Sequence, residues 1–403
     1  MPGDHDHAGD GPTAIGPSLV PAGLSAWSVA LLAVATGLTV ASLYYAQPLL
    51  DEIRLDMGLS VAGAGLIVTA SQVGYAVGLL FLVPLGDLCE RRRLAVLLTL
   101  GSAAALAGTA ASPSAPLLYC AIVLVGVLSA SAQVLVALAA SLAAPADRGR
   151  VVGTVMSGLL LGVLLARTAS GYVAQAGGWR LVFWLAALLM LLLALVLRSS
   201  LPRHREDTRL SYRALLGTVP VILKEEPILR LRSLYGALSF GCFSIMWTPL
   251  ALLLSGPPFG YGSGTIGMFG LAGVAGALAA SVAGRLADRG WQRRMTGTAG
   301  VLMTVAWLLL WLGGRSASLL AVGVVLLDLA AQGLHITNQS EIYRLRPEAR
   351  SRITAAYMTI FFLGGVVGSA LSSLVFAHAG WTGVCLLGAG DGGLAVVLWL
   401  VST

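Results

Sequence analysis

The sequence predicts an all-α membrane protein with twelve transmembrane helices in two pseudo-symmetric six-helix bundles. Three observations predict this fold: an apolar composition, a series of helix-length apolar stretches, and a similarity between the two halves of the chain. Of the 403 residues, 57% are hydrophobic and 11% are charged, whereas soluble domains have about 45–50% and about 25%. Such a composition is typical of a chain whose surface faces lipid.

Twelve stretches are long and apolar enough to cross a bilayer. A helix needs about 20 mostly apolar residues to span about 30 Å of hydrocarbon, and its backbone polar groups must bond within the segment. We place the spans at 27–50, 61–84, 94–112, 115–139, 151–174, 181–197, 233–254, 264–284, 295–313, 317–338, 354–376 and 381–401.

Basic residues gather in the loops on one side of these spans. The loops after the second, fourth, sixth, eighth and tenth spans hold 21 of the 25 Lys and Arg residues, and the loops on the other side hold Arg54, Arg180 and Arg315. Cytoplasmic loops carry the excess of Lys and Arg. We therefore expect a multi-pass protein of the cell membrane with both termini in the cytoplasm. Because membrane topology explains the net charge of +7, nucleic acid is not expected as a partner.

The spans divide the chain into four parts. Residues 1–26 contain no Lys or Arg and are rich in Gly, Pro and Asp, which predicts a disordered cytoplasmic tail. Residues 27–197 and 233–403 are expected to form the two bundles. The charged segment between them, 198–232, is expected to be a solvated cytoplasmic linker, and contact with anionic lipid headgroups is the alternative.

The two halves match at an offset of 201 or 202 residues. The matching residues are Leu85 with Leu286, Asp87 with Asp288, Arg92-Arg93 with Arg293-Arg294, Pro145 with Pro347, Arg148 with Arg350, Arg150 with Arg352, Met156 with Met358, Gly162 with Gly364, and Gly178-Trp179 with Gly380-Trp381. Parallel six-helix repeats build one large group of secondary transporters, whose substrate site lies between the halves near the middle of the membrane.

Two loops carry a motif that resembles a known family. After the second and eighth spans the chain reads VPLGDLCERR (83–92) and GRLADRGWQR (284–293). Both resemble Gly-x-Leu-Ala-Asp-Arg-x-Gly-Arg-Arg, the loop signature of the major facilitator superfamily, although Val83, Glu90 and Trp291 replace signature glycines. The resemblance covers 27–401 and implies the twelve-helix transporter fold of that family.

The charges of these loops are candidates for a cytoplasmic gate. A carboxylate just beyond a helix end, next to arginines, can hold neighbouring helix ends together in one state of a transport cycle. The candidate gate residues are Asp87, Arg91, Arg92, Arg148, Asp288, Arg293 and Arg350. The alternative is that these charges only set orientation and solubility.

The fifth span contains a second, looser resemblance. Gly153, Gly162, Ala166-Arg167 and Ser170-Gly171 follow the spacing of the antiporter signature of proton-coupled drug exporters, with Arg167 in place of its proline. Small residues at this spacing also allow close helix packing, which is the alternative explanation.

Helix 317–338 carries a polar stripe at its end. Asp328, Gln332, His335 and Gln339 are spaced 0, 4, 7 and 11 residues apart, so at about 100° per residue they share one face over about 16 Å. Ionisable groups at membrane depth usually face a cavity or a partner. Because desolvation favours protonation of a carboxylate and histidine titrates near neutral pH, we predict that Asp328 and His335 couple transport to protons. A purely structural network is the alternative.

Further polar and aromatic side chains are predicted to line a substrate cavity. The predicted cavity residues are Tyr44, Tyr45, Gln47, Gln72, Tyr75, Gln133, Arg167, Gln332 and Gln339. Aromatic and amide groups suit an amphipathic small molecule, although Tyr44 and Tyr45 can equally be interfacial anchors. Arg167 can bind an anionic substrate group, balance Asp328, or pair within its own bundle.

The resulting prediction is a monomeric secondary transporter that exports a small organic molecule in exchange for protons. Uptake, facilitated diffusion and a non-transporting receptor of the same fold are the alternatives. Lys224 is the single lysine of the chain, so no phosphate-binding Gly-Lys-Ser/Thr loop exists. We expect no enzymatic activity, cofactor or metal, because no span holds a second histidine or a nucleophile with its base.

Overall fold

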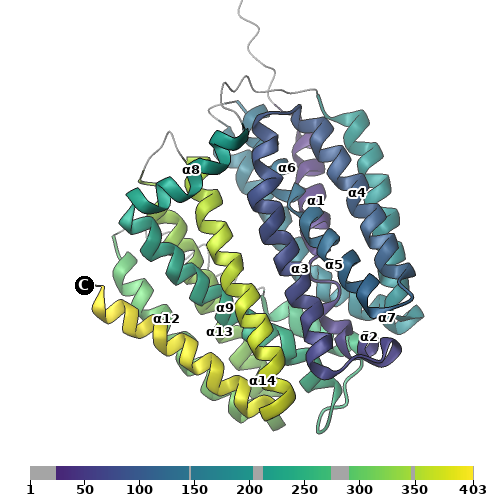
Figure 1. Cartoon of the computed structure of the whole chain (residues 1–403), viewed down its shortest axis with the longest axis vertical. Coiled ribbons are helices and arrows are strands. Elements are labelled where there is room, and N and C mark those ends of the chain that lie inside the picture. The colour runs from purple at the N-terminus through teal and green to yellow at the C-terminus, as the bar shows by residue number, and fades with distance from the viewer. Residues whose placement is uncertain (1–23, 145–146, 203–211, 274–289, 346–349, 403) are drawn as a thin grey trace, which may run out of the picture.

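The computed structural model describes residues 24–144, 147–202, 212–273, 290–345 and 350–402, which are almost entirely helical (Figure 1). Its α-helices are α1 (Ala26–Ala41), α2 (Leu50–Met57), α3 (Val61–Phe81), α4 (Arg91–Ala111), α5 (Ala115–Ser129), α6 (Ser131–Leu142), α7 (Arg148–Ser200), α8 (Tyr212–Glu225), α9 (Pro227–Ser255), α10 (Ser263–Met268), α12 (Gln292–Leu312), α13 (Ala317–Ile342) and α14 (Arg350–Val401). Short 3-10 turns are η1 (Gln47–Leu49), η2 (Val83–Asp87), η3 (Phe269–Ala272) and η4 (Gly313–Arg315).

The described helices correspond to the predicted spans, apart from the part of the span predicted at 264–284 that lies outside the described residues. Within the described ranges, eight helical segments are long and apolar enough to cross a membrane. Two of them, α7 and α14, have 53 and 52 residues and each holds two spans, which meet at Gly178 (φ 78°) and Gly380 (φ 61°). Glycine adopts such positive φ angles without steric cost. Helix α1 and the segment Ser263–Ala272 are shorter apolar helices at the start of the two remaining predicted spans, and residues 274–284 lie outside the described part of the chain. The all-α prediction is confirmed.

Two expected boundaries differ from the structure. The first span was placed at 27–50, but α1 ends at Ala41 and the chain continues through tight turns into η1, where Pro48 stands in the first turn. Proline fits this position because its missing N–H is not needed there. The predicted solvated linker also contains a helix, α8, whose Tyr212 hydroxyl donates to the Phe81 carbonyl at 2.8 Å.

Each bundle is held together by close packing of glycine-bearing helices. A Cβ atom added to Gly37, Gly158 or Gly162 would collide with backbone of the facing helix, where α1 lies on the first half of α7. In the second bundle, Gly364 makes the corresponding contact with Ala237 of α9. Gly162 and Gly364 are equivalent in the internal repeat. The same small residue therefore lets two helices approach closely in each half.

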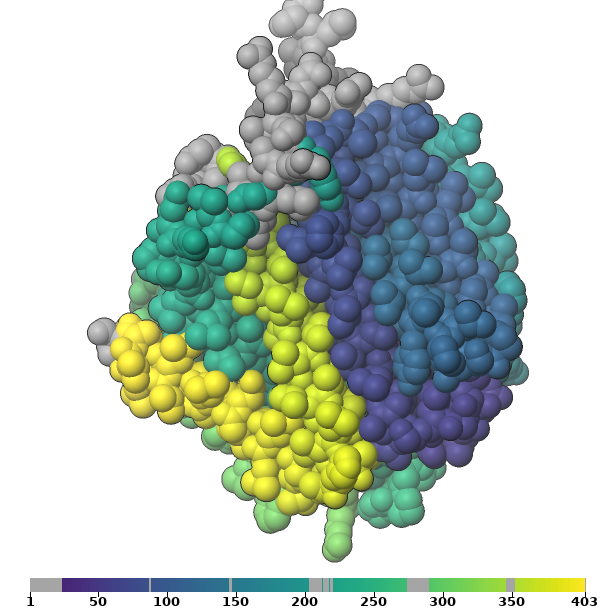
Figure 2. Space-filling model, viewed as in Figure 1, coloured from purple at the N-terminus to yellow at the C-terminus, as the bar shows by residue number. Residues whose placement is uncertain are grey.

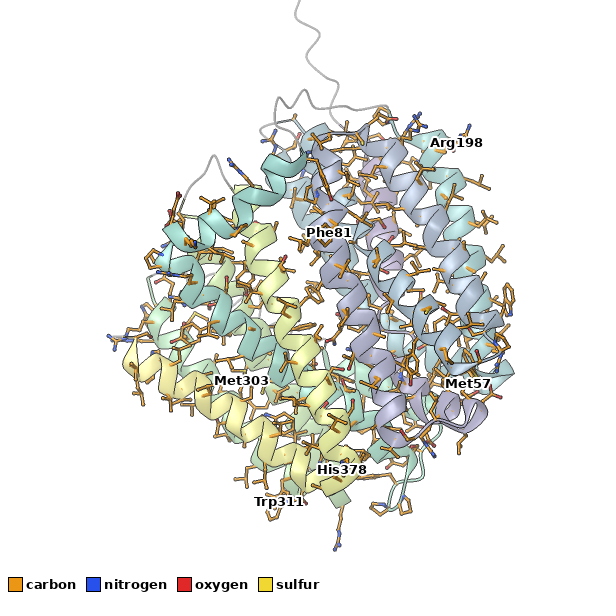
Figure 3. The ribbon with its side chains drawn as sticks, in the orientation of Figure 1. Met57, Phe81, Arg198, Met303, Trp311 and His378 are labelled. Carbon is orange, nitrogen blue, oxygen red and sulfur yellow. The ribbon has the colours of Figure 1, made fainter. Side chains whose placement is uncertain are left out.

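The two bundles lie side by side, with α3 against α14 in the space-filling view (Figure 2). Arg198 marks one end of the molecule, which we call the basic end, and Met57 and His378 lie near the opposite end (Figure 3).

Two seams join the bundles. Thr69 of α3 and Ser369 of α14 share a hydrogen bond of 2.8 Å, and α7 packs against α10 in the second seam, where the Thr168 hydroxyl donates to the Gly267 carbonyl at 3.0 Å.

Helix α2 lies at the end opposite the basic end and contacts α7 next to the kink at Gly178. Glu52 accepts a hydrogen bond of 2.8 Å from the backbone N–H of Trp179, and Asp56 accepts one of 3.1 Å from its indole N–H. Arg180 forms an ion pair and hydrogen bond with the same Asp56 carboxylate. The hydrogen bond from Arg180 holds the pKa of Asp56 below its ordinary value of 3.8.

We expect Asp56→Asn to lower thermal stability by about 2 °C at pH 7, because a half-exposed ion pair contributes about 0.5–1 kcal/mol. Since the folded pKa of Asp56 is lowered, its contribution is complete above the unfolded pKa and is lost as the pH falls through the folded pKa. Melting curves at pH 7 and pH 3 measure this difference. Asp51→Asn is the control, because among the described residues Asp51 pairs with Arg54 of its own helix alone. An equal effect of Asp56→Asn at both pH values would contradict the assignment.

Candidate functional site

Arg167 lies buried between aromatic rings of both bundles. Its Nε donates to Gln47 Oε1 at 2.6 Å, and the guanidinium carbon is 4.7 Å from the centre of the Tyr44 ring and 4.0 Å from that of Trp247. Gln47 and Tyr44 belong to the first bundle and Trp247, on α9, to the second. The Nη2 atom of Arg167 is buried and has no hydrogen-bond partner among the described residues. A guanidinium with an open donor in a lipid-embedded protein marks a functional candidate.

Asp328 contacts this cluster through the indole N–H of Trp247. The carboxyl of Asp328, on α13, is 2% exposed and accepts a hydrogen bond of 3.0 Å from Trp247 Nε1. Within the described structure no ion pair joins Asp328 directly to Arg167. A buried charge is costly without compensation. The indole compensates both charges, because its face attracts the guanidinium and its N–H binds the carboxylate.

A small cavity of about 10 Å³, about the space of one water molecule, adjoins this cluster. The residues that line it are Leu43, Tyr44, Gln47, Gln72, Tyr75, Phe240 and Phe362. Gln72 Nε2 donates to Ser244 Oγ at 3.2 Å, and the rings of Tyr75 and Phe362 have their centres 4.4 Å apart. Since α3 supplies Gln72 while α9 supplies Ser244, the cavity lies at the contact between the two bundles.

The structure brings most of the predicted first-half residues together at this place. Tyr44, Gln47, Gln72 and Tyr75 line the cavity, and Gln47 also contacts Arg167. Two other predicted cavity residues, Gln133 and Tyr45, do not line the cavity. Gln133 donates to the Tyr75 hydroxyl at 3.5 Å, and Tyr45 packs in the apolar core.

The polar stripe of α13 is divided between two environments. Asp328 meets Trp247, whereas His335 Nδ1 lies 3.0 Å from the Tyr357 hydroxyl and the His335 ring packs on Phe361 at 4.5 Å. The side chains of Gln332 and Gln339 are half-buried and make no hydrogen bond with the part of the chain that is described. Asp328 and His335 share a helix face as predicted but do not touch, so their joint role stays a prediction.

The predicted gate is described only in part. Asp288 and the side chains of Asp87 and Arg350 lie outside the described residues. Arg91 is buried and its Nε donates to the Gly86 carbonyl at 3.0 Å, and Arg92 Nη1 donates to the Leu201 carbonyl at 2.9 Å.

Two further gate arginines, Arg148 and Arg293, are exposed. Arg148 forms no ion pair with any residue of the described ranges. Arg91 and Arg92 thus bind backbone carbonyls, and Arg92 also forms an ion pair of 3.7 Å with Glu90 of the same loop. A gate in which Asp87 or Asp288 pairs with these arginines remains a prediction.

Sequence reasoning missed the residues that α9 contributes to the site. Phe240, Phe243, Ser244 and Trp247 recur at intervals of 3, 1 and 3 residues, which places them on one face of α9. Their signal was hidden because aromatic residues in an apolar span usually face the core or lipid. The described residues contain no group of three or more His, Cys, Asp or Glu that could hold a metal ion.

Comparison with known families decides the class of this site. Residues 32–343 match the family model described as the Major Facilitator Superfamily. The chain belongs to the Major Facilitator Superfamily. As a member it is a multi-pass membrane transporter of a small molecule and not an enzyme.

Relatives from bacteria agree with this membership. The uncharacterized transporter YgaY of Escherichia coli O157:H7 is 52% identical over 93% of this chain and 95% of its own length. A chloramphenicol resistance protein of Streptomyces lividans is 28% identical over 72% of this chain and 74% of its own length. The crystal structure of a bacterial homologue of the human lysosomal transporter Spinster, inward-facing and unoccupied, shares the Major Facilitator fold with a TM-score of 0.72 at 13% identity, covering 93% of this chain and 94% of that one.

Proposed function

We propose that this transporter exports a small, amphipathic organic molecule from the cytoplasm in exchange for protons. The observation that carries the proposal is the Arg167–Trp247–Asp328 contact, in which buried charges from different bundles meet on one indole beside an aromatic cavity. Substrate and proton would then act on the same contact between the bundles. Transport would follow from the separation and closure of that contact, as alternating access requires.

The geometry supports exchange because proton and substrate would favour opposite states of the contact. A proton on Asp328 removes the negative charge that holds the Trp247 N–H, and so weakens the link from Arg167 to the second bundle. A molecule in the cavity would order Tyr44 and Gln47, which are the side chains that position Arg167. His335 lies on the same face of α13 toward the basic end and would receive the proton on its way to the cytoplasm.

The proposed direction of transport depends on which end of the chain faces the cytoplasm. Cytoplasmic loops carry the excess of Arg and Lys, so we place the basic end and both termini in the cytoplasm of the cell. The two seams close the half of the molecule near the opposite end. In that orientation we propose that the contact between the bundles opens toward the cytoplasm when an exporter loads its substrate. The chloramphenicol resistance protein among the relatives supports export.

Proteoliposomes with an acidic lumen test the proposal, with chloramphenicol as the first probe and uncharged aromatic amides as the next. We expect the lumen to take up the probe and to become less acidic in step, as proton antiport requires. Movement of probe and protons in the same direction would show an uptake permease. Probe flux without protons would show facilitated diffusion, and binding without flux would show a receptor.

A further inference from the structure

Three glycines lie along one side of the segment that runs from α10 into η3. Gly267, Gly270 and Gly273 recur at intervals of three residues, and η3 (Phe269–Ala272) is a 3-10 turn. In a 3-10 helix the residues at i and i+3 lie above one another, whereas close packing of α-helices uses small residues at intervals of four. The glycine period therefore matches the local backbone, and we call these three residues the glycine face.

The glycine face lies against the stem of Arg167, on the first half of α7. A Cβ atom added to Gly270 would lie 2.9 Å from Arg167 Cβ and 3.3 Å from Arg167 Cδ, and one added to Gly267 would collide with the Arg167 carbonyl oxygen. Arg167 Cβ is bonded to the backbone of α7, so no change of rotamer can move it away. The second bundle therefore leaves room for Arg167 because these two positions carry no side chain.

The glycine face also approaches Asp328, the second charge of the site. A Cβ atom on Gly273 would lie at an ordinary contact distance of 3.5 Å from Asp328 Oδ2, and closer to the Cδ2 atom of Leu164. Unlike Arg167 Cβ, this methyl group is the end of a side chain that can change rotamer. A side chain at Gly273 would therefore be tolerated, and the constraint on the Arg167 side chain comes from Gly270.

The backbone itself does not require glycine on this face. None of the three glycines has a positive φ angle, so alanine would fit the backbone and would favour a helical conformation. What excludes a side chain at Gly270 is the stem of Arg167 opposite it. Arg167 is 3% exposed and its Nη2 has no hydrogen-bond partner among the described residues. A buried guanidinium with an open donor depends on its packing to keep its orientation.

We propose that Gly270 is a positioning residue for transport. By lacking a side chain, it lets the stem of Arg167 lie against η3, and the guanidinium then meets Gln47 in its own bundle and Trp247 in the other. The inference rests on the proposed function in so far as the Arg167–Trp247–Asp328 contact drives transport. It assigns to the second bundle a hold on Arg167 in addition to the ring of Trp247.

Fluorine NMR of the full chain labelled with 5-fluorotryptophan measures the position of Arg167 without any substrate. Loss of one signal in Trp247→Phe assigns the resonance of Trp247, whose ring centre is 4.0 Å from the Arg167 guanidinium carbon. Arg167→Gln then gives the resonance of the ring without the cation. Gly270→Ala should move the Trp247 signal from its native position toward the position in Arg167→Gln.

Two other alanine substitutions are matched controls. Gly273→Ala changes the same glycine face, where the added methyl group meets the flexible end of Leu164, and Gly333→Ala changes α13, where it meets nothing within 4 Å. Both should leave the Trp247 signal in place. Chloramphenicol flux in proteoliposomes should fall about tenfold in Gly270→Ala and stay unchanged in both controls.

The background Arg167→Gly separates this contact from any other effect of alanine. Since that substitution removes the Cβ atom opposite Gly270, Gly270→Ala should lower the melting temperature of the native chain but leave that of the Arg167→Gly variant unchanged. If Gly270→Ala alone does not give monodisperse protein, its recovery in the double variant shows the same contact.

The proposal is overturned by any of three results. They are a Trp247 signal in Gly270→Ala that stays in place or shifts equally in Gly333→Ala, an equal loss of stability or of monodisperse protein in both backgrounds, and normal flux in Gly270→Ala despite a shifted signal. The first two do not depend on proton exchange. Absence of antiport in the unsubstituted chain, with the shift of Trp247 in Gly270→Ala intact, would instead reject the proposed function and keep the contact between Gly270 and Arg167.

Discussion

Asp328→Asn is expected to abolish transport against a gradient, with the pH-driven accumulation of substrate falling by about 100-fold, the upper range of coupling between two sites. Asparagine cannot take up or release a proton. Its side-chain oxygen can still accept the hydrogen bond of 3.0 Å that Trp247 Nε1 donates to Asp328. The contact between the bundles is therefore expected to survive while its response to protons is lost. Exchange of substrate down its own gradient should continue.

Asp391→Asn is the matched control for this substitution. Asp391 is also an aspartate within a span, on α14, but its carboxyl forms no hydrogen bond or ion pair with a described residue, and its Oδ2 is buried without a partner. We predict a local structural role for Asp391, so its substitution should leave pH-driven accumulation close to that of the unsubstituted chain. Accumulation and counterflow in proteoliposomes, each normalised to the amount of monodisperse protein, measure both variants.

The outcomes separate coupling from stability. If Asp328→Asn accumulates substrate with an unchanged dependence on pH, then Asp328 is not the coupling group. If Asp391→Asn loses transport to the same extent, the loss in both variants comes from the bundle rather than from the site. His335→Gln gives a further comparison, because His335 contacts Tyr357 and Phe361 and not Trp247. Its effect should fall on the rate of proton release and leave substrate binding unchanged.

The fold could be predicted from the sequence because lipid imposes simple requirements. Backbone groups in hydrocarbon must bond within their own helix, so apolar length alone locates the spans. What the apolar pattern could not show is where a helix stops inside the membrane. The turns after Ala41 have an apolar sequence, yet they form a tight bend that carries Gln47 to Arg167. Likewise, the charges of 198–232 concealed the amphipathic helix α8.

The polar residues of the site could be predicted, as could Tyr44 and Tyr75, whereas the aromatic residues of α9 could not. Gln72, Arg167 and Asp328 stand out because polar groups at membrane depth are few and costly. Trp247 does not stand out in the sequence, because an aromatic residue in an apolar span usually packs in the core or faces lipid. Helix periodicity also gives the direction of a side chain but not its partner. For this reason the polar stripe of α13 predicted that Asp328 acts with His335. In the structure, the carboxyl of Asp328 accepts a hydrogen bond from Trp247 instead.

A disulfide between α3 and α14 is expected to stop transport almost completely, by about tenfold or more, because alternating access requires these helices to part. The Thr69 and Ser369 hydroxyl oxygens are 2.8 Å apart and both side chains are buried. Two cysteines at these positions would place their sulfur atoms close to the bond length of about 2.05 Å. Oxidation of the double variant Thr69→Cys/Ser369→Cys would then hold α3 and α14 together in the closed state of this seam.

The native cysteines make this experiment practicable. Cys89 and Cys120 are exposed and should be replaced by Ser, whereas Cys242 and Cys385 are buried and can remain. Transport should fall on oxidation, return on reduction, and stay unchanged in each single-cysteine variant. Recovery by a reductant distinguishes a locked transporter from a misfolded one. If the cross-linked protein transports normally, the seam does not open during the cycle, and the bundles must exchange access by a motion that leaves α3 and α14 together.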